Sequence, residues 1–224
     1  MRLLLLLSFM TLLSISLTAQ KNTLSSAADS DPQATALLKK VQAKYESFTT
    51  VGMDFSLIIQ IPEAQEEVQK GTLYQKGENY KLEMKDQLVF FDGKTMWLYL
   101  KGMNEVQIMD AQEMPEGMLS PKDLLRIYEQ KDFVYALTTR TKIGNRLVEQ
   151  IEFKPLKKNV DYSKMRVSVE KGTHEIVQIE AFSKDGSRYI LRVDDLKPNV
   201  ALADATFKFN KQDYPDVYVE DLRY

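Results

Sequence analysis

The fold is decided by the stretch Phe90-Phe91-Asp92-Gly93-Lys94-Thr95-Met96-Trp97-Leu98-Tyr99. This stretch predicts a β-hairpin, because Asp92-Gly93 supplies residues that tolerate the positive φ of a tight turn between two strand-like runs. Side chains alternate along a strand, so Phe90 and Phe91 point to opposite faces, and Met96 and Trp97 do the same. A sheet with apolar groups on both faces needs two apolar partners. One can be the protein core, and the other can be something that the protein carries.

Strands with a clean two-residue period are predicted on both sides of this hairpin. Runs of alternating apolar and polar residues begin near Phe55, Tyr80, Met165 and Tyr189. Turn signals between such runs give about eleven candidate strands, and the short connections favour antiparallel pairing in sequence order. A sheet of that size curls or closes, and its apolar face has to be covered. The sequence therefore predicts a mainly β protein with some helix (α+β), built on one large antiparallel sheet.

Two helices are predicted to cover the apolar face. Asp31-Pro32 gives an N-cap and a first-turn proline, and apolar residues from Leu37 to Tyr45 follow at helical spacing over about four turns. A second helix is expected over residues 120–128, and the methionine-rich residues 103–119 before it are expected to form a pliable loop. Two short helices are too few to cover about eleven strands. The interior is therefore expected to be only partly filled by the protein's own side chains.

The N-terminal residues resemble a targeting segment. Residues 1–19 are predicted to be a secretory signal peptide, because Arg2 precedes a leucine-rich run that ends near Ala19. The run is short for a membrane span, which takes about 20 apolar residues, so an uncleaved anchor is the less favoured alternative. Residues 20–30 are expected to form a flexible leader to a single domain over residues 31–224. The chain has no cysteine, so we expect a soluble, disulfide-free protein that is not itself lipid-modified.

The composition offers little for catalysis, metal binding or nucleic-acid binding. The chain carries one histidine, His174, and a net charge of −2 without a block of like charge. A nucleic-acid interface is therefore not expected, and neither is a zinc site, which draws on several Cys or His ligands. A hydrolase would need His174 to hold a nucleophilic serine, and the sequence has no Gly-x-Ser-x-Gly elbow. We expect no enzymatic activity, no cofactor and no metal.

The apolar residues of the hairpin and its neighbours are expected to cluster in the first half of the sheet. Two interpretations stay open for this cluster: an ordinary filled core, or the wall of a cavity that binds acyl chains. Methionine is a flexible gap-filler that suits surfaces which repack around varied partners, and this favours the cavity. The expected cavity-lining residues are Phe55, Leu57, Tyr74, Phe90, Met96, Trp97, Leu98, Met109 and, from the second helix, Leu124.

Short motifs occur along the chain in a fixed order. They are Leu38 to Phe55, Val68 to Leu73, Asp92 to Tyr99, Asn104 to Val106, Ser120 to Leu125, and the closing Asp204-Ala205-Thr206-Phe207-Lys208-Phe209. Each motif is weak alone, but their order and spacing are fairly specific. Together they resemble the LolA-type periplasmic carriers, which move lipoproteins from the inner to the outer membrane of Gram-negative bacteria. The resemblance covers nearly the whole mature chain.

The resemblance implies an incomplete, unclosed antiparallel β-barrel covered by a helical lid. It implies an apolar cavity that shelters the acyl chains of a lipoprotein, in a protein of the periplasm. Carriers of this type receive acylated lipoproteins from an inner-membrane lipoprotein-releasing ABC transporter and pass them to an outer-membrane acceptor. They hydrolyse nothing themselves. We expect this chain to do the same as a monomer.

One motif departs from the family pattern. Known members carry Lys/Arg-Arg-Pro, whose arginine acts in lid closure and cargo transfer, whereas this chain has Lys76 in the arginine's place and Gly77 in the proline's. Lysine lacks the planar fork of arginine. Lys76 is therefore the expected lid-gating residue, with the cargo class left open. The alternatives are a carrier of another envelope lipid or glycolipid, and an envelope-assembly module with a filled core that binds no lipid.

Overall fold

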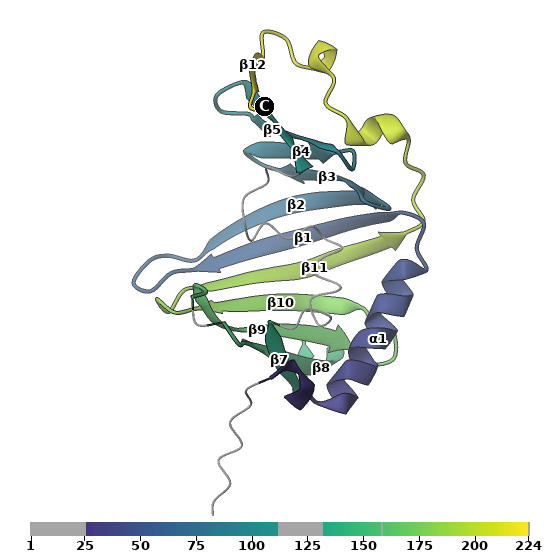
Figure 1. The fold of residues 1–224 in the computed structure, drawn as a ribbon, viewed down its shortest axis with the longest axis vertical. Coiled ribbons are helices and arrows are strands. Elements are labelled where there is room, and N and C mark those ends of the chain that lie inside the picture. The colour runs from purple at the N-terminus through teal and green to yellow at the C-terminus, as the bar shows by residue number, and fades with distance from the viewer. Residues whose placement is uncertain (1–25, 112–131, 158, 224) are drawn as a thin grey trace, which may run out of the picture.

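One large β-sheet forms the body of the protein in the computed structural model, which describes residues 26–111, 132–157 and 159–223 (Figure 1). Its strands are β1 (Val51–Gln60), β2 (Glu67–Lys76), β3 (Asn79–Met84), β4 (Gln87–Phe91), β5 (Thr95–Leu100), β6 (Glu105–Asp110), β7 (Phe133–Ile143), β8 (Arg146–Pro155), β9 (Tyr162–Glu170), β10 (Ile176–Ser183), β11 (Arg188–Pro198) and β12 (Tyr218–Asp221).

The order of these strands confirms the predicted fold class. In the described part of the chain it is β12-β6-β5-β4-β3-β2-β1-β11-β10-β9-β8-β7. All neighbours are antiparallel except β12 and β6, which run parallel. The edge strands β12 and β7 do not pair with each other, so the sheet is an unclosed barrel. Pairing follows sequence order except where β1 joins β11 and where β12 joins β6.

The prediction of a pliable loop over residues 103–119 is wrong for residues 105–110. Residues 105–110 form β6, which pairs with β5 through contacts such as Met96 with Met109 and Trp97 with Ile108. The reason is that Val106 and Ile108 alternate with Gln107 and Met109, a two-residue period that the methionine content obscures. The predicted helix over residues 120–128, the residue Leu124 and positions 112–119 lie outside the described residues.

Helix α1 (Pro32–Glu46) forms as predicted and covers one half of the sheet. Asp31 caps it by accepting a 2.8 Å hydrogen bond from the Gln33 N–H, and Pro32 occupies the first helical position. We call the sheet face that packs on α1 the inner face and the opposite one the outer face. Figure 1 shows the helix lying across the end of the sheet that contains β8 to β11. The helix buries Ala34, Leu37, Leu38 and Val41 against inner-face side chains of β7 to β10.

Part of the predicted flexible leader is ordered against the edge of the sheet. Residues Ala27–Asp29 form a short 3₁₀ helix that is capped by Ser26. The Ser30 hydroxyl accepts a 3.2 Å hydrogen bond from the backbone N–H of Tyr135, and the backbone N–H of the next residue, Asp31, donates to the Tyr135 carbonyl at 2.9 Å. These bonds satisfy polar groups at the start of the edge strand β7. A leader contacts the sheet here because an edge strand offers it unpaired hydrogen-bonding groups.

The Phe90–Tyr99 hairpin forms between β4 and β5, with Gly93 at φ +89° in the turn. Phe91 lies opposite Met96 on the inner face, and Phe90 lies opposite Trp97 on the outer face. Phe90, Phe91 and Met96 are all buried. The prediction that the hairpin is apolar on both faces is therefore confirmed, and each face has its own partner.

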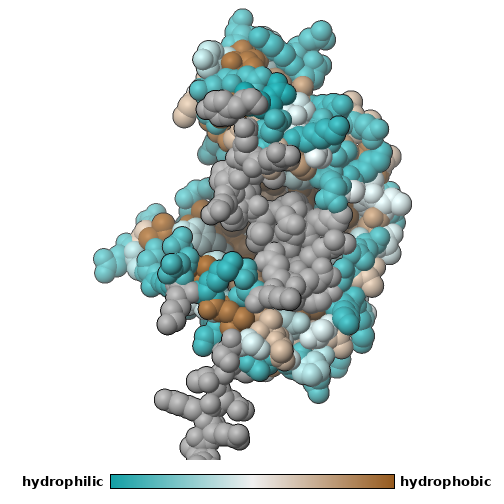
Figure 2. All heavy atoms as spheres, viewed as in Figure 1, coloured by the Kyte–Doolittle hydropathy of each residue, from teal (hydrophilic) through white to brown (hydrophobic). Residues whose placement is uncertain are grey.

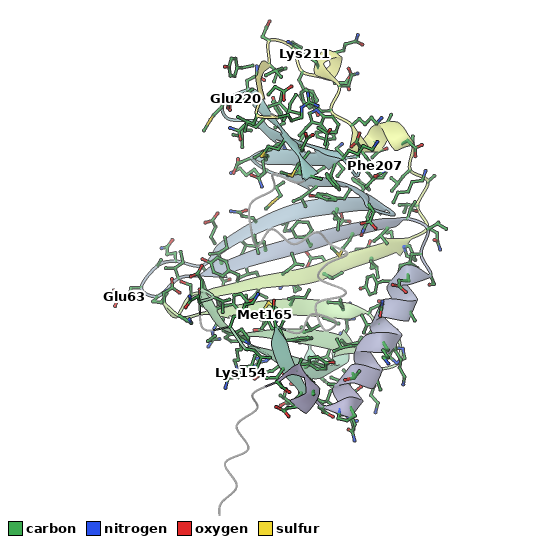
Figure 3. The ribbon with its side chains drawn as sticks, in the orientation of Figure 1. Glu63, Lys154, Met165, Phe207, Lys211 and Glu220 are labelled. Carbon is green, nitrogen blue, oxygen red and sulfur yellow. The ribbon has the colours of Figure 1, made fainter. Side chains whose placement is uncertain are left out.

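The outer partner of the hairpin is the C-terminal segment over residues 199–217, which we call the strap. Its short 3₁₀ helix Asp204–Phe207 contacts β3 and β4, and Phe207 is completely buried (Figures 1 and 3). The ring of Phe209 lies 5.9 Å from that of Phe90 and 6.1 Å from that of Tyr99. After the strap the chain enters β12 and adds to the edge of β6. The outer apolar surface of the hairpin is thus covered by the protein itself.

Candidate functional site

The inner face divides into a filled half and a hollow half. Under α1 the core is packed, with Ile151, Phe153 and Val169 fully buried. Beyond the helix lies a cavity of about 600 Å³, within the range of about 300–1,000 Å³ that small-molecule sites occupy. Figure 2 shows this side of the molecule, where described atoms in the central recess are brown and hydrophilic groups surround them. The cavity is lined by Tyr45, Val51, Met53, Phe55, Leu57, Leu73, Gln75, Tyr80, Leu82, Met84, Gln87, Val89, Met96, Leu98, Gln107, Met109, Ile176, Ile179, Leu191 and Val193.

The wall of this cavity carries no charged residue among the described positions that line it. Its polar groups are the hydroxyls of Tyr45 and Tyr80 and the amides of three glutamines, Gln75, Gln87 and Gln107. The rest of the wall is aliphatic, aromatic or thioether, including Met53, Met84, Met96 and Met109. Methionine has three rotatable bonds and a polarisable sulfur, so such a wall adapts to flexible apolar molecules of varied shape. The cavity therefore suits a hydrocarbon ligand.

The close approach of Phe55 to Gly71 shapes one side of the cavity. Gly71 lies opposite Phe55 in the β1–β2 pair, and a Cβ at Gly71 would meet the Phe55 ring and lie 2.8 Å from the Glu83 carbonyl oxygen. Only glycine leaves room for the ring to lie across the neighbouring strand. This contact holds the buried Phe55 ring against the neighbouring strand, where it forms part of the cavity wall.

Gly71→Ala is expected to lower the free energy of unfolding by about 1–3 kcal/mol, because the added methyl overpacks the Phe55 ring and the backbone behind it. Urea denaturation measures the change. Gly102→Ala is the matched control, since no atom lies within 4 Å of the position of its added methyl. Equal stability of the two variants would contradict the close-packing role of Gly71.

The structure brings together five of the predicted cavity residues: Phe55, Leu57, Met96, Leu98 and Met109. Tyr74, Phe90 and Trp97 do not line the cavity, and their predicted place in its wall is corrected. Each of the three alternates with cavity-lining neighbours on its own strand, so each points to the outer face. Leu124 lies outside the described residues.

Sequence reasoning missed most of the remaining wall. Leu73, Leu82 and Val89 form one continuous row across β2, β3 and β4, which ends at the predicted Leu98 on β5. For Leu82 the signal was its alternation with Lys81 and Glu83, whereas Val89 stands between the apolar Leu88 and Phe90 and is placed in the wall by the strand register. Leu191 and Val193 come from β11, which lies next to β1 in the sheet although it is far away in the sequence. No local pattern could have placed them beside Phe55 and Leu57.

The predicted lid residue Lys76 lies on the outer face, where its ammonium group is 2.7 Å from the Asp204 carboxylate. Asp204 opens the 3₁₀ helix of the strap, so this ion pair joins the β2–β3 hairpin to the strap. The hydrogen bond from Lys76 holds the pKa of Asp204 below its usual value. The lid-gating role of Lys76 stays a prediction.

A charged cluster lies next to the cavity, beside the C-terminal turn of α1. Lys44 is 3.0 Å from Glu175, and the Arg146 guanidinium is 2.9 Å from Glu175 and 2.8 Å from Glu170. The hydrogen bonds from Arg146 and then from Thr173 lower the pKa of Glu170 to about 2. The cluster joins the helix end to the β7–β8 and β9–β10 turns, beside the cavity residues Tyr45 and Ile176.

Glu170→Gln should destabilise the protein at neutral pH but not at low pH. The carboxyl pKa is about 2 in the folded protein against an ordinary value of 4.5, so the stabilisation is complete above pH 4.5 and is lost as the pH falls towards 2. The melting temperatures of the two proteins, measured across this range, are expected to converge on acidification. A gap that stays constant with pH would show that the Glu170 charge has no part in stability.

The described residues contain no arrangement that points to metal chemistry. No group of three or more histidine, cysteine or acidic side chains could hold a metal ion in the described ranges. His174 lies in the turn before β10 with a φ of +59°, and its backbone N–H donates to the Glu170 carbonyl at 3.0 Å. None of the described helices is long and apolar enough to cross a membrane.

The chain matches one protein family and is similar to several solved structures. Residues 46–210 match the family model of the outer membrane lipoprotein carrier protein LolA. No curated protein matches the chain. Among solved structures, an uncharacterized conserved protein from Thermus thermophilus is similar with a TM-score of 0.57 and 12% identity, covering 84% of this chain and 99% of that one.

Two further solved structures are similar to the chain. The lipoprotein LppX of Mycobacterium tuberculosis has a TM-score of 0.52 and 11% identity, covering 78% of this chain and 100% of that chain. A LolA superfamily protein from Nitrosomonas europaea has a TM-score of 0.42 and 14% identity, covering 79% of this chain and 97% of that chain. At these identities the likeness concerns the fold alone.

Proposed function

The chain belongs to the LolA family of outer membrane lipoprotein carrier proteins, and from this premise we propose that it is a periplasmic carrier that shelters acyl chains in the cavity and delivers them towards the outer membrane. The observation that carries the proposal is the cavity of about 600 Å³, which is apolar and left open by α1. Members of this family act as binding and carrier proteins, and the wall of this cavity offers hydrocarbon contacts and no charged group among its described residues.

The free energy of burial explains why such a cavity is useful. Each CH₂ group removed from water gains about 0.8 kcal/mol, so a free acyl chain crosses an aqueous compartment only at a large cost. A carrier offsets that cost by replacing water with side chains of similar polarity. The sheet supplies a pre-formed surface, and the methionines allow the surface to repack around chains of different length.

Acylated lipoproteins are the proposed cargo. The proposed partners are an inner-membrane ABC transporter that releases lipoproteins to the carrier and an outer-membrane acceptor that receives them. The same cavity chemistry accepts the acyl chains of another envelope lipid or glycolipid, because the wall contacts hydrocarbon and not a head group. The experiment therefore has to identify which class of cargo the protein binds.

Native mass spectrometry of the processed, full-length protein tests the proposal. The protein is expressed in a Gram-negative host, isolated from the periplasm, and compared before and after a wash with mild detergent. We expect adducts with the mass of acyl lipids or lipoproteins that the detergent removes and that added lipid restores. A protein that never acquires an acyl adduct, although it is folded, would overturn the carrier function and favour an envelope-assembly module.

A further inference from the structure

Tyr45 lies where the helix-covered core meets the cavity. It belongs to the last turn of α1, packs against the core under the helix, and lines the cavity together with Ile176 and Ile179. Its hydroxyl oxygen accepts a 3.2 Å hydrogen bond from the backbone N–H of Ile176 at the start of β10. This bond fixes the phenol at the cavity wall and satisfies the first N–H of the strand.

The hydroxyl proton of Tyr45 remains available. A phenol can donate one hydrogen bond and accept others, and the Tyr45 hydroxyl donates to none of the described residues. Each of the other polar groups of the wall donates a hydrogen bond within the protein: Gln75 to the Gly77 carbonyl, Gln107 to Glu105, Gln87 to the Met84 sulfur and Tyr80 to the Met96 sulfur. Among the described wall residues, Tyr45 therefore offers a hydroxyl donor that is held in place and unused.

We propose that the Tyr45 hydroxyl donates a hydrogen bond to the acyl carbonyl oxygen of the bound molecule, an ester or an amide. The inference rests on the proposed function, because an acyl chain brings its carbonyl group into the cavity with it. A carbonyl oxygen is an acceptor, and burying it without a donor costs free energy. The Tyr45 hydroxyl supplies that donor at one end of the cavity.

This contact orients the cargo. The hydrocarbon extends from Tyr45 across the sheet towards Met96 and Met109 on β5 and β6. The head group lies on the other side of the carbonyl, beside the cluster of Lys44, Glu175 and Arg146 that adjoins Tyr45 and Ile176. The carbonyl at Tyr45 thus fixes one end of the cargo, and the hydrocarbon takes the direction that the methionines of β5 and β6 line.

The chemistry of the wall also selects the ligand class. The cations nearest to Tyr45 are Lys44 and Arg146, and both already pair with Glu175, at 3.0 Å and 2.9 Å. A carboxylate at this place would add a second negative charge beside Glu175, so a neutral ester or amide is favoured over a free fatty acid. Burial raises the pKa of Tyr45 to about 12, so its hydroxyl keeps its proton at every physiological pH.

The test compares two lipids that differ only in the carbonyl, 1-monododecanoylglycerol and its ether analogue 1-O-dodecylglycerol. Each displaces a polarity-sensitive dye from the folded, full-length protein. We expect the wild type to prefer the ester by about 3- to 10-fold, the value of one hydrogen bond. Tyr45→Phe should remove this preference while leaving the affinity for the ether within about twofold, because the ring and its hydrocarbon contacts remain.

Tyr80→Phe is the matched control, since it removes a hydroxyl of the same cavity that points at the Met96 sulfur, 3.9 Å away. This variant should keep the ester preference. Infrared spectroscopy of the carbonyl-labelled ester bound to the wild type tests the hydrogen bond without changing the protein. We expect the carbonyl stretching band of the bound ester at a lower frequency than in hydrocarbon solvent.

Three results overturn the inference. They are equal affinity of the wild type for ester and ether, an ester preference that survives in Tyr45→Phe, and an unshifted carbonyl band. All three leave the carrier function standing, because both lipids still bind. A wild type that binds neither lipid and no dye overturns the inference together with the carrier function, so the two failures are distinguishable.

Discussion

Leu57→Glu is expected to abolish the binding of acyl chains. Leu57 lines the cavity from β1, and the described wall around it has no cation that could pair with a carboxylate at this position. An unpaired charge facing hydrocarbon is strongly unfavourable, so the affinity for an acyl lipid should fall by at least about 100-fold, or roughly 2.7 kcal/mol. Displacement of a cavity-bound dye, or the loss of lipid adducts in native mass spectrometry, measures the effect.

The neighbouring residue supplies the control for this substitution. Ile58 follows Leu57 on the same strand, is equally half-buried, and points to the outer face, where it pairs with Val68 and Ile190. Ile58→Glu should leave lipid affinity within about twofold, because its side chain lies on the face of the sheet opposite the cavity. Equal loss of binding in both variants would mean that the effect comes from damage to the strand. Unchanged binding in Leu57→Glu would remove this cavity as the lipid site.

Phe207→Ala is expected to cost about 3–5 kcal/mol of unfolding free energy, a large part of the roughly 5–15 kcal/mol that holds a typical domain folded. Phe207 is completely buried where the strap contacts β3 and β4, and its removal leaves a cavity under the strap. It also loosens the cover over Phe90, whose ring packs on Phe209 of the same segment. Urea denaturation followed by circular dichroism gives the value.

The exposed ion pair of the same segment serves as the comparison. Asp204→Asn removes the charge partner of Lys76, and the Asp204 side chain is 79% exposed. Ion pairs in water contribute little, so this change should be small beside that of Phe207→Ala. If the two variants were equally unstable, the strap would be held by electrostatics and not by the burial of its aromatic residues.

The sequence by itself was sufficient for the local elements. Asp31-Pro32 and the apolar spacing that follows define α1, and Asp92-Gly93 defines the turn of the hairpin. These features depend on caps, turn residues and periodicity within a few residues, so they are visible without the fold. The order of the short motifs also identified the family that the family model then showed.

The side of the sheet on which a residue lies was harder to predict from the sequence. Where a strand is apolar on both faces, the two-residue period does not show which residues lie on the inner face of the sheet and which on the outer face. Tyr74, Phe90 and Trp97 were therefore expected in the cavity wall, although they alternate with the residues that line it. In β1 the polar residues Asp54 and Ser56 mark the outer face, and Phe55 and Leu57 between and beside them line the cavity.

What the sequence determined is that the Phe90–Tyr99 hairpin is apolar on two faces, so that each face needs an apolar partner. Only the tertiary structure decided which partner each face has. The strap, more than a hundred residues later in the chain, covers Phe90, and the inner side of Phe91 and Met96 is left to the hollow half of the sheet. The physical reason is that burial depends on contacts between segments that are distant in the sequence, and not on local pattern. Here those contacts are the pairing of β1 with β11, the packing of the strap and the position of α1.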